Sequence, residues 1–281
     1  MTTTARSAGR NLPAAITTGL VLGMVVVATL LWWSWGFVIF ASAALTLGVW
    51  EVCRALARCG MHPARWPLLV GTPVILIGSY AAGQSTGEPK DALWIITGGL
   101  ALMMIAALFV RIPRGVEGFV ADVAASAFVI GYLPLLGSSV ALMLASNHGA
   151  ARILCFIVCP IACDTGAYAF GSLFGRHKMA PSISPAKTWE GFVGGIVLTM
   201  VVAAVVVHLV LHAPIWVGLL LGLVVGGAGV LGDLVESAIK RDAKLKDMSH
   251  LLPGHGGVMD RLDSMLVAAP AAWLVMYLLV V

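Results

Sequence analysis

Charged side chains are scarce in this chain of 281 residues. Only 11% of its residues are Asp, Glu, Lys or Arg, whereas 60% are hydrophobic. A soluble domain has about 25% charged residues, so this composition excludes an ordinary water-soluble protein. It predicts an all-α polytopic membrane protein. The formal net charge is only +4. Basic residues in such a protein orient the spans, so we expect no nucleic-acid partner.

A cysteine pair spaced for metal binding is also lacking. The chain has five cysteines but no Cys-x-x-Cys sequence, and their spacing indicates no disulfide framework. Cys155, Cys159 and Cys163 recur every four residues, on one face of a helix. They could be ligands, but small residues also let membrane helices approach closely, and free buried cysteines are common. The packing interpretation is favoured.

Long apolar runs are what the sequence has in abundance. A membrane-spanning helix needs about 20 mostly apolar residues. Nine segments meet this requirement: 13–31, 35–53, 66–83, 92–110, 119–144, 152–174, 191–211, 214–236 and 262–281. The first follows Arg6 and Arg10 and exceeds the apolar core of a signal peptide, about 7–15 residues, so we expect an uncleaved span. The fifth carries Gly131, Pro134 and Gly137 and is expected to be kinked.

The basic residues predict how these spans are oriented. With the N-terminus in the cytoplasm, every lysine and arginine except Lys90 and Arg152 falls on the cytoplasmic side. This is the distribution that the positive-inside rule requires, and we expect a multi-pass protein of the plasma membrane with its site facing the cytoplasm.

Polar loops are short before residue 150 and long after it. Residues 1–281 are therefore interpreted as a single integral membrane protein. Its N-terminal helical region is 1–150. Its catalytic region is 151–281, with two cytoplasmic loops at about 175–190 and 237–261.

The first polar stretch begins with a carboxylate inside a predicted span. Asp164 is costly there and indicates function by default, although a hydrogen-bonded packing residue is the alternative. The loop that follows is rich in cations and hydroxyl groups: Arg176, His177, Lys178, Ser182, Ser184, Lys187 and Thr188. Such groups suit a polyphosphate. An ordinary positive-inside loop would explain the lysines but not the stretch SPAKTWEGFVGG.

The second polar stretch joins the last two predicted spans. Five of its residues are spaced to share one helical face: Asp233, Glu236, Ser237, Lys240 and Arg241. Asp260 and Asp263 lie three residues apart at the start of the last span, where helix capping is the alternative explanation.

Carboxylates that converge from two helices repel one another unless a cation lies between them. Oxygen ligands with room for water and phosphate suit Mg²⁺. We therefore expect Asp233, Asp260 and Asp263 to hold this metal. Interleaved lysines and arginines would bind phosphates, and the combination is typical of phosphoryl or nucleotidyl transfer.

Two stretches carry a resemblance to a known family. The sequences SAIKR (237–241), KD (246–247), PGHGG (253–257) and DRLD (260–263) resemble the signature of the phosphatidate cytidylyltransferases, also called CDP-diacylglycerol synthases. The segment DTGAYAFGSLFGRHKMAPSISPAKTWEG resembles another segment typical of this family. The N-terminal spans are merely compatible with it. Asp242 and Lys244 fall where the family varies, so neither is assigned a role.

The resemblance implies a reaction in which CTP and phosphatidate give CDP-diacylglycerol and pyrophosphate. It implies that Asp233 and Asp260 bind Mg²⁺ with Asp263 in the same cluster, that a monovalent cation such as K⁺ accompanies it, and that the protein is a homodimer. The residues expected to act in catalysis are Asp233, Asp260, Lys240 and Arg241. Those expected to bind substrate are Asp164, Ser184, Lys187, Thr188, Ser237, Lys246, His255 and Arg261.

Three other functions remain open at this point. A CTP-using lipid kinase would share the nucleotide and the metal but would need a base for a neutral hydroxyl. A transporter or channel would use Asp164 and Asp233 along an ion pathway, with charges spread through several spans. A structural scaffold would leave the long polar stretches unexplained.

Overall fold

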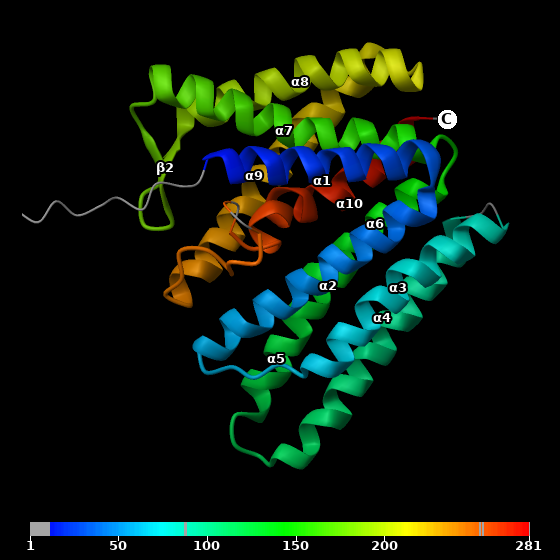
Figure 1. The fold of residues 1–281 in the computed structure, drawn as a ribbon, viewed down its shortest axis with the longest axis vertical. Helices are drawn as coiled ribbons and strands as arrows, with labels where there is room; N and C mark the ends of the chain where they lie inside the picture. Colours follow the sequence, from blue (N-terminus) through cyan, green and yellow to red (C-terminus); the bar gives the residue numbers. More distant parts are fainter. Residues whose placement is uncertain (1–11, 87–88, 253, 255, 281) are drawn as a thin grey trace, which may run out of the picture.

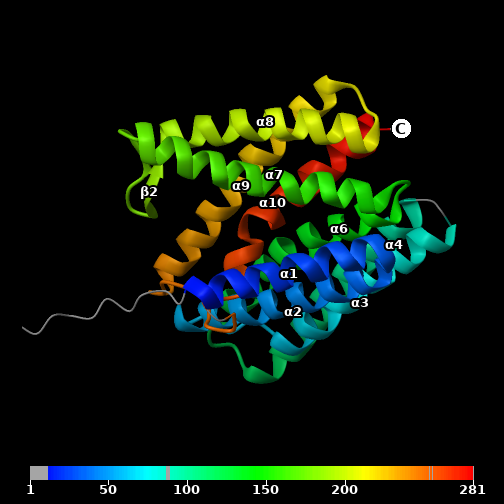
Figure 2. The same ribbon diagram turned by 45° about the horizontal axis from the view of Figure 1, so that its top comes forward.

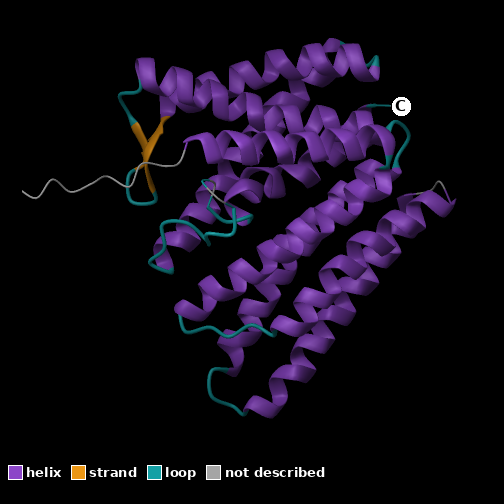
Figure 3. Cartoon of the chain, viewed as in Figure 1, coloured by secondary structure: helices purple, strands orange, loops and turns teal. Residues whose placement is uncertain are grey.

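The computed structural model describes residues 12–86, 89–252, 254 and 256–280 (Figures 1 and 3). Its long helices are α1 (Leu12–Trp32), α2 (Ser34–Arg58), α3 (Arg65–Thr86), α4 (Pro89–Arg111), α5 (Phe119–Ile130), α6 (Leu136–Ala145), α7 (Gly149–Phe174), α8 (Trp189–Leu211), α9 (Ile215–Asp242) and α10 (Met259–Leu279). A short 3₁₀ turn, η1 (Ile112–Arg114), follows α4, and a π-helical turn, η2 (Gly131–Leu135), joins α5 to α6. The prediction of an all-α polytopic membrane protein is confirmed.

Eight helical segments of the described chain are long and apolar enough to cross a membrane. They correspond to the second through ninth predicted spans. The first predicted span is α1, a helix of 21 residues. Arg6 and Arg10, which precede it, lie outside the described residues.

The fifth predicted span is interrupted, as its glycines and proline indicated. The π-helical turn η2 contains Pro134, which cannot donate the backbone hydrogen bond of a regular helix. Turns of this kind occur mostly as local insertions in α-helices. Residues 119–145 are therefore long and apolar enough to cross a membrane as one span, built from two α-helices.

Both expected cytoplasmic loops differ from the prediction. Part of the first forms an antiparallel hairpin of β1 (Lys178–Ala180) and β2 (Ser184–Thr188). The second is shorter than expected at both ends. Helix α9 continues to Asp242, and α10 already begins at Met259. Polar residues at the end of α9 ended the hydropathy signal but did not end the helix.

The helices are arranged so that the hairpin and the loop between α9 and α10 lie at the same end of the molecule (Figures 1 and 2). The hairpin and the end of α9 carry the basic residues Lys178, Lys187, Lys240 and Arg241 to this end. Helix α10 packs against α9, α6, α2 and α7, so it connects the N-terminal and C-terminal helices. We call the end that carries the hairpin the polar end.

Glycines lie at the contacts between α7 and α8 and between α8 and α9. A Cβ atom on Gly218 would lie 2.5 Å from the Cα of Ala204, and one on Gly166 would lie 2.9 Å from the Cα of Gly195. No such atom fits without a shift of the backbone. Small residues let these helices touch backbone to backbone, as is typical of membrane proteins.

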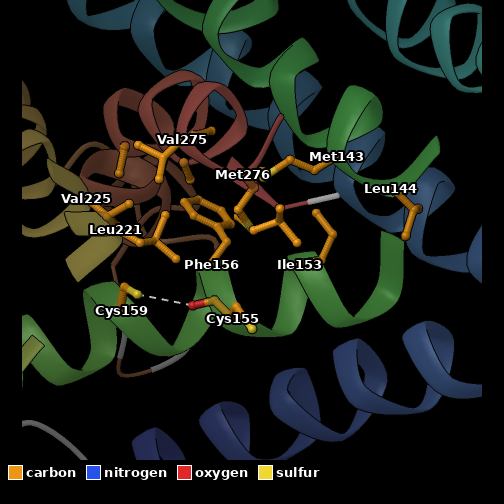
Figure 4. Close-up of a cluster of buried hydrophobic side chains, with 14 of the residues drawn as sticks. Met143, Leu144, Ile153, Cys155, Phe156, Cys159, Leu221, Val225, Val275 and Met276 are labelled. Carbon is orange, nitrogen blue, oxygen red and sulfur yellow. Dashed lines mark hydrogen bonds between the residues drawn. The ribbon is translucent and has the colours of Figure 1, made fainter. Parts of the chain in front are cut away.

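The three regularly spaced cysteines serve packing. Cys155 and Cys159 belong to the buried cluster in Figure 4, where α7 meets α6, α9 and α10. The Cys159 thiol donates a hydrogen bond to the carbonyl of Cys155, 3.1 Å away. Cys163 is buried one turn further on. The described chain contains no group of His, Cys, Asp or Glu side chains that would make a cysteine metal site.

Arg152 holds the last helix at the opposite end. Its guanidinium is buried and donates to the carbonyls of Met276 and Val280, 2.7 and 2.8 Å away, and to that of Asn147. The Met276 carbonyl also accepts from the amide of Val280, whereas the Val280 carbonyl lies past the end of α10, where the arginine gives it a donor.

Candidate active site

The structure brings the two polar stretches together at the polar end. Lys187 on β2 forms an ion pair with Asp233 on α9, with Nζ 2.6 Å from Oδ2. Arg241, two turns further along α9, donates to the carbonyl of Ile183 at the tip of the hairpin, 3.2 Å away. Residues about 50 positions apart in sequence are therefore joined by a strong charge-assisted bond and a second hydrogen bond.

The hairpin is fixed at its base by the start of α8. The Thr188 hydroxyl accepts a hydrogen bond from the amide of Gly191 and caps this helix. Glu190 accepts from the amides of Arg176 and His177, and its Oε1 lies 2.6 Å from the His177 ring. A carboxylate is favoured at a helix N-terminus, where it complements the helix dipole. Lys187 is thus presented from a supported strand.

A cavity of about 200 Å³ lies beneath the hairpin, between α7, α8 and α9. Its polar lining consists of Asp164, Lys187, Thr188, Asp233 and Ser264. The rest of the lining is mostly apolar, including Tyr168 and Phe192. A few convergent polar groups in an otherwise apolar cavity are the usual features of a ligand site.

Two carboxylates, Asp164 and Asp233, line this cavity, and Asp263 lies on the neighbouring helix α10. The charges of Asp164, Asp233 and Asp263 act on one another. Helices α9 and α10 touch at this level, because a Cβ atom on Gly232 would lie 2.3 Å from the carbonyl oxygen of Asp263. Of these carboxylates, Asp233 forms an ion pair shorter than 4 Å with Lys187. Together they concentrate negative charge beside the cavity.

Asp260 has a different environment from the other two predicted metal ligands. Its Oδ1 accepts from Lys240 Nζ, 2.8 Å away, and its Oδ2 accepts from the amides of Met248 and Gly257 at 3.0 and 2.7 Å. Lys240 is also paired with Glu236, which is fully buried. Both oxygens of Asp260 are therefore engaged, and it anchors the loop between α9 and α10 to α9.

The remaining predicted residues lie around the same end. Ser237 donates to Oδ1 of Asp233 at 3.3 Å. Ser184 pairs with Ala180 in the hairpin, and Lys246 is exposed in the loop. Arg261 is exposed on α10, and its charge acts on Asp164. His255 lies outside the described residues.

Sequence reasoning missed one residue that supports this site. Glu51 on α2 has no exposed surface and accepts hydrogen bonds from Ser249, Val258 and Met259. The available signal was a single carboxylate in an otherwise apolar span, which is costly unless it has partners. Glu236 was placed on the correct helical face, but its complete burial was not expected.

Comparison with known proteins identifies the family. The model of the cytidylyltransferase family matches residues 13–279. The chain belongs to the cytidylyltransferase family. Phosphatidate cytidylyltransferases from Mycobacterium bovis and Mycobacterium leprae are 38% and 35% identical to it, over 97% of this chain and 90% and 89% of theirs. One from Staphylococcus saprophyticus is 47% identical over 38% of this chain and 42% of its own.

This membership confirms the resemblance seen in the two polar stretches. The protein is an enzyme of the nucleotidyltransferase class. The match extends through the N-terminal helices as well, where the sequence had offered compatibility alone. The interpretations as a transporter or as a structural scaffold do not agree with it.

Proposed function

We propose that this chain is a phosphatidate cytidylyltransferase, which converts CTP and phosphatidate to CDP-diacylglycerol and pyrophosphate. The observation that carries the proposal is the match over nearly the whole chain to relatives with this name. The cavity lined by Lys187 and Asp233 is the proposed location of the reaction. An anionic lipid headgroup at the membrane surface and a nucleotide from the aqueous phase can both reach the polar end.

In the proposed reaction an oxygen of the phosphatidate phosphate attacks the α-phosphorus of CTP. A new phosphoanhydride bond forms, and the bond to pyrophosphate breaks. The attacking phosphate is already ionised near neutral pH, so no strong general base is needed. Positioning and charge neutralisation provide the rate enhancement. Lys187, Lys240 and Arg241 are the cations that would offset phosphate charge at this site.

The carboxylate oxygens at this site suit Mg²⁺ whose coordination is completed by substrate phosphates. Asp233 lines the cavity, and Asp260 and Asp263 lie in the first two turns of the adjoining helix α10. The described residues hold no ready cluster of three metal ligands. Mg²⁺ is commonly bound by one or two carboxylates, with water and substrate phosphates completing the coordination. The metal would neutralise charge on the triphosphate. We propose that its protein ligands come from Asp233, Asp260 and Asp263, with a monovalent cation such as K⁺ as a companion.

The orientation and assembly of the protein are also proposals. Basic residues at the polar end support a cytoplasmic active site in the plasma membrane, by the positive-inside rule. We propose a homodimer with no nucleic-acid partner. A reporter fused after Val281 should report a location outside the cytoplasm. A cytoplasmic signal would contradict this orientation.

The function is tested with purified protein, radiolabelled CTP and phosphatidate. CDP-lipid and pyrophosphate should form, EDTA should abolish their formation, and Mg²⁺ should restore it. A lipid kinase would instead release CDP and phosphorylate a lipid alcohol. Failure of the wild-type protein to form CDP-lipid with Mg²⁺ and K⁺ present would overturn the proposal.

A further inference from the structure

Glu51 is a buried carboxylate far from the cavity in sequence but bonded to the loop that borders it. It lies in α2 with no exposed surface. Its Oε1 accepts from the Ser249 hydroxyl and from the amide of Val258 at 3.0 Å, and its Oε2 accepts from the amide of Met259 at 2.7 Å. A charge buried this fully persists only with such a complete set of donors.

These donors lie at the start of α10, where backbone amides lack partners within the helix. Val258 precedes the helix and Met259 is its first residue. An anion is favoured at this position because several amides point outward and the helix dipole is positive there. Glu51 supplies that anion from a different span. It therefore fixes the position of the last helix relative to α2.

The bond network continues from Glu51 to the active site. The amide of Gly257, next to Val258, donates to Asp260 at 2.7 Å. Asp260 in turn holds Lys240 on α9 at 2.8 Å. Displacing the backbone at 257–259 would therefore displace Asp260, and Lys240 would lose the partner that orients its ammonium group.

The loop is shaped to receive Glu51. A Cβ atom on Gly257 would lie 2.7 Å from Oε1 of Glu51, closer than nonbonded contacts allow. Gly256, next to it, has a φ of +84°, a backbone conformation that suits glycine. Two adjacent glycines thus bring the backbone amides within reach of the carboxylate.

We propose that Glu51 is a positioning residue for the active site, holding the segment 257–259 so that Asp260 can orient Lys240. Its effect on turnover rests on the proposed function. Its effect on the loop conformation does not depend on the proposed function, because the contacts between Glu51 and the loop are present whatever reaction is catalysed. The N-terminal helices thereby take part in forming the site.

The test compares Glu51→Gln with Asp122→Asn. The glutamine keeps the size of the side chain but turns an amide N–H toward a backbone N–H that needs an acceptor. Asp122 is a matched control, since it is also buried in the N-terminal half. It bonds to Arg111 and to the amide of His62, and to none of the described residues of the loop.

Two measurements are made on each folded variant. In Glu51→Gln, amide hydrogen exchange at 248–259 should be faster than in wild type, and kcat for CDP-lipid formation should fall about 10- to 100-fold, the usual cost of losing a supporting residue. Asp122→Asn should leave exchange in this segment and kcat near the wild-type values, even if it lowers the melting temperature.

Unchanged exchange at 248–259 in Glu51→Gln would overturn the proposal, as would a wild-type kcat. If wild-type protein forms no CDP-lipid, the proposed function fails, and the exchange measurement still decides the role of Glu51. If Glu51→Gln does not fold, Gly257→Ala replaces it, because its methyl group disturbs the same contact and leaves the carboxylate in place. It should give the same faster exchange and lower kcat, and wild-type values for both would overturn the proposal.

Discussion

Lys187 Nζ lies 2.6 Å from Asp233 Oδ2, so a strand of the hairpin and the end of α9 meet in one ion pair beside the cavity. Both side chains are partly buried, which strengthens their interaction relative to a surface pair. The pair joins a cation suited to phosphate with a carboxylate suited to metal.

Replacing Lys187 with methionine should lower kcat/KM for CTP by about 100-fold or more, the scale seen when a preorganised donor to a reacting group is lost. Lys187→Arg keeps the charge and should retain part of the activity. Lys244→Met serves as a control, because this lysine is exposed in the loop and has no assigned role. Labelled CTP reports all three variants. Equal activity of the Lys187→Met and Lys244→Met proteins would remove Lys187 from the site.

Asp260→Asn should reduce turnover without preventing membrane insertion. The amide has one acceptor oxygen, so it can accept from Lys240 or from the two backbone amides, and its NH2 group faces donors on the other side. We expect kcat to fall at least about 10-fold. Asp242→Asn, at the exposed end of α9, is the control. A variant with wild-type kcat and wild-type Mg²⁺ dependence would show that the Asp260 charge is dispensable.

Gly232→Ala should separate Asp233 from Asp263. The new methyl group would meet the carbonyl oxygen of Asp263, so α9 and α10 must move apart. Overpacking of this kind costs about 1–3 kcal/mol. We expect a lower melting temperature and a higher Mg²⁺ concentration for half-maximal activity. Gly227→Ala on the same helix has open space around its Cβ position and should change neither. Identical Mg²⁺ titrations for the two variants would argue against a metal between these helices.

Arg152→Met should destabilise the protein while sparing its chemistry. The Val280 carbonyl would lose the arginine as its donor, and the Met276 carbonyl would keep the amide of Val280, at a cost of about 1–3 kcal/mol. Thermal unfolding in detergent should show the loss, with Arg152→Lys intermediate because a single ammonium cannot replace the guanidinium fork. The residue lies at the end opposite the cavity, so kcat measured well below the melting temperature should stay near wild type. A large drop in kcat at that temperature would contradict this separation.

The positions of the spans were predictable because a bilayer imposes a simple requirement on length and hydropathy. The ends of the spans were less predictable. Helix α9 carries Glu236, Lys240 and Arg241 past the apolar run, since their side chains pair with one another or with the hairpin. Tertiary partners thus extend a helix that composition alone would end. The short hairpin had no signal strong enough to separate it from a loop.

The candidate site was predictable where several polar residues cluster in sequence, and less so where one residue acts alone. The pairing of Lys187 with Asp233 places residues of both polar stretches side by side, and both were among the expected site residues. The hydrogen bonds that Asp260 accepts from Lys240 and from backbone amides depend on the conformation of the loop, which residue spacing in the sequence does not predict. Glu51 is a single polar residue among apolar ones, so its partners became apparent only in three dimensions.

The backbone contacts among α7, α8 and α9 have a consequence for how this sequence can vary. Gly166, Gly218 and Gly222 each face backbone atoms of a neighbouring helix, with no room for one methyl group. Gly23 and Gly98, in the N-terminal helices, face open space. A saturation library should therefore tolerate alanine at the second pair and reject it at the first three. The close approach of α7, α8 and α9 thus restricts these three positions to glycine.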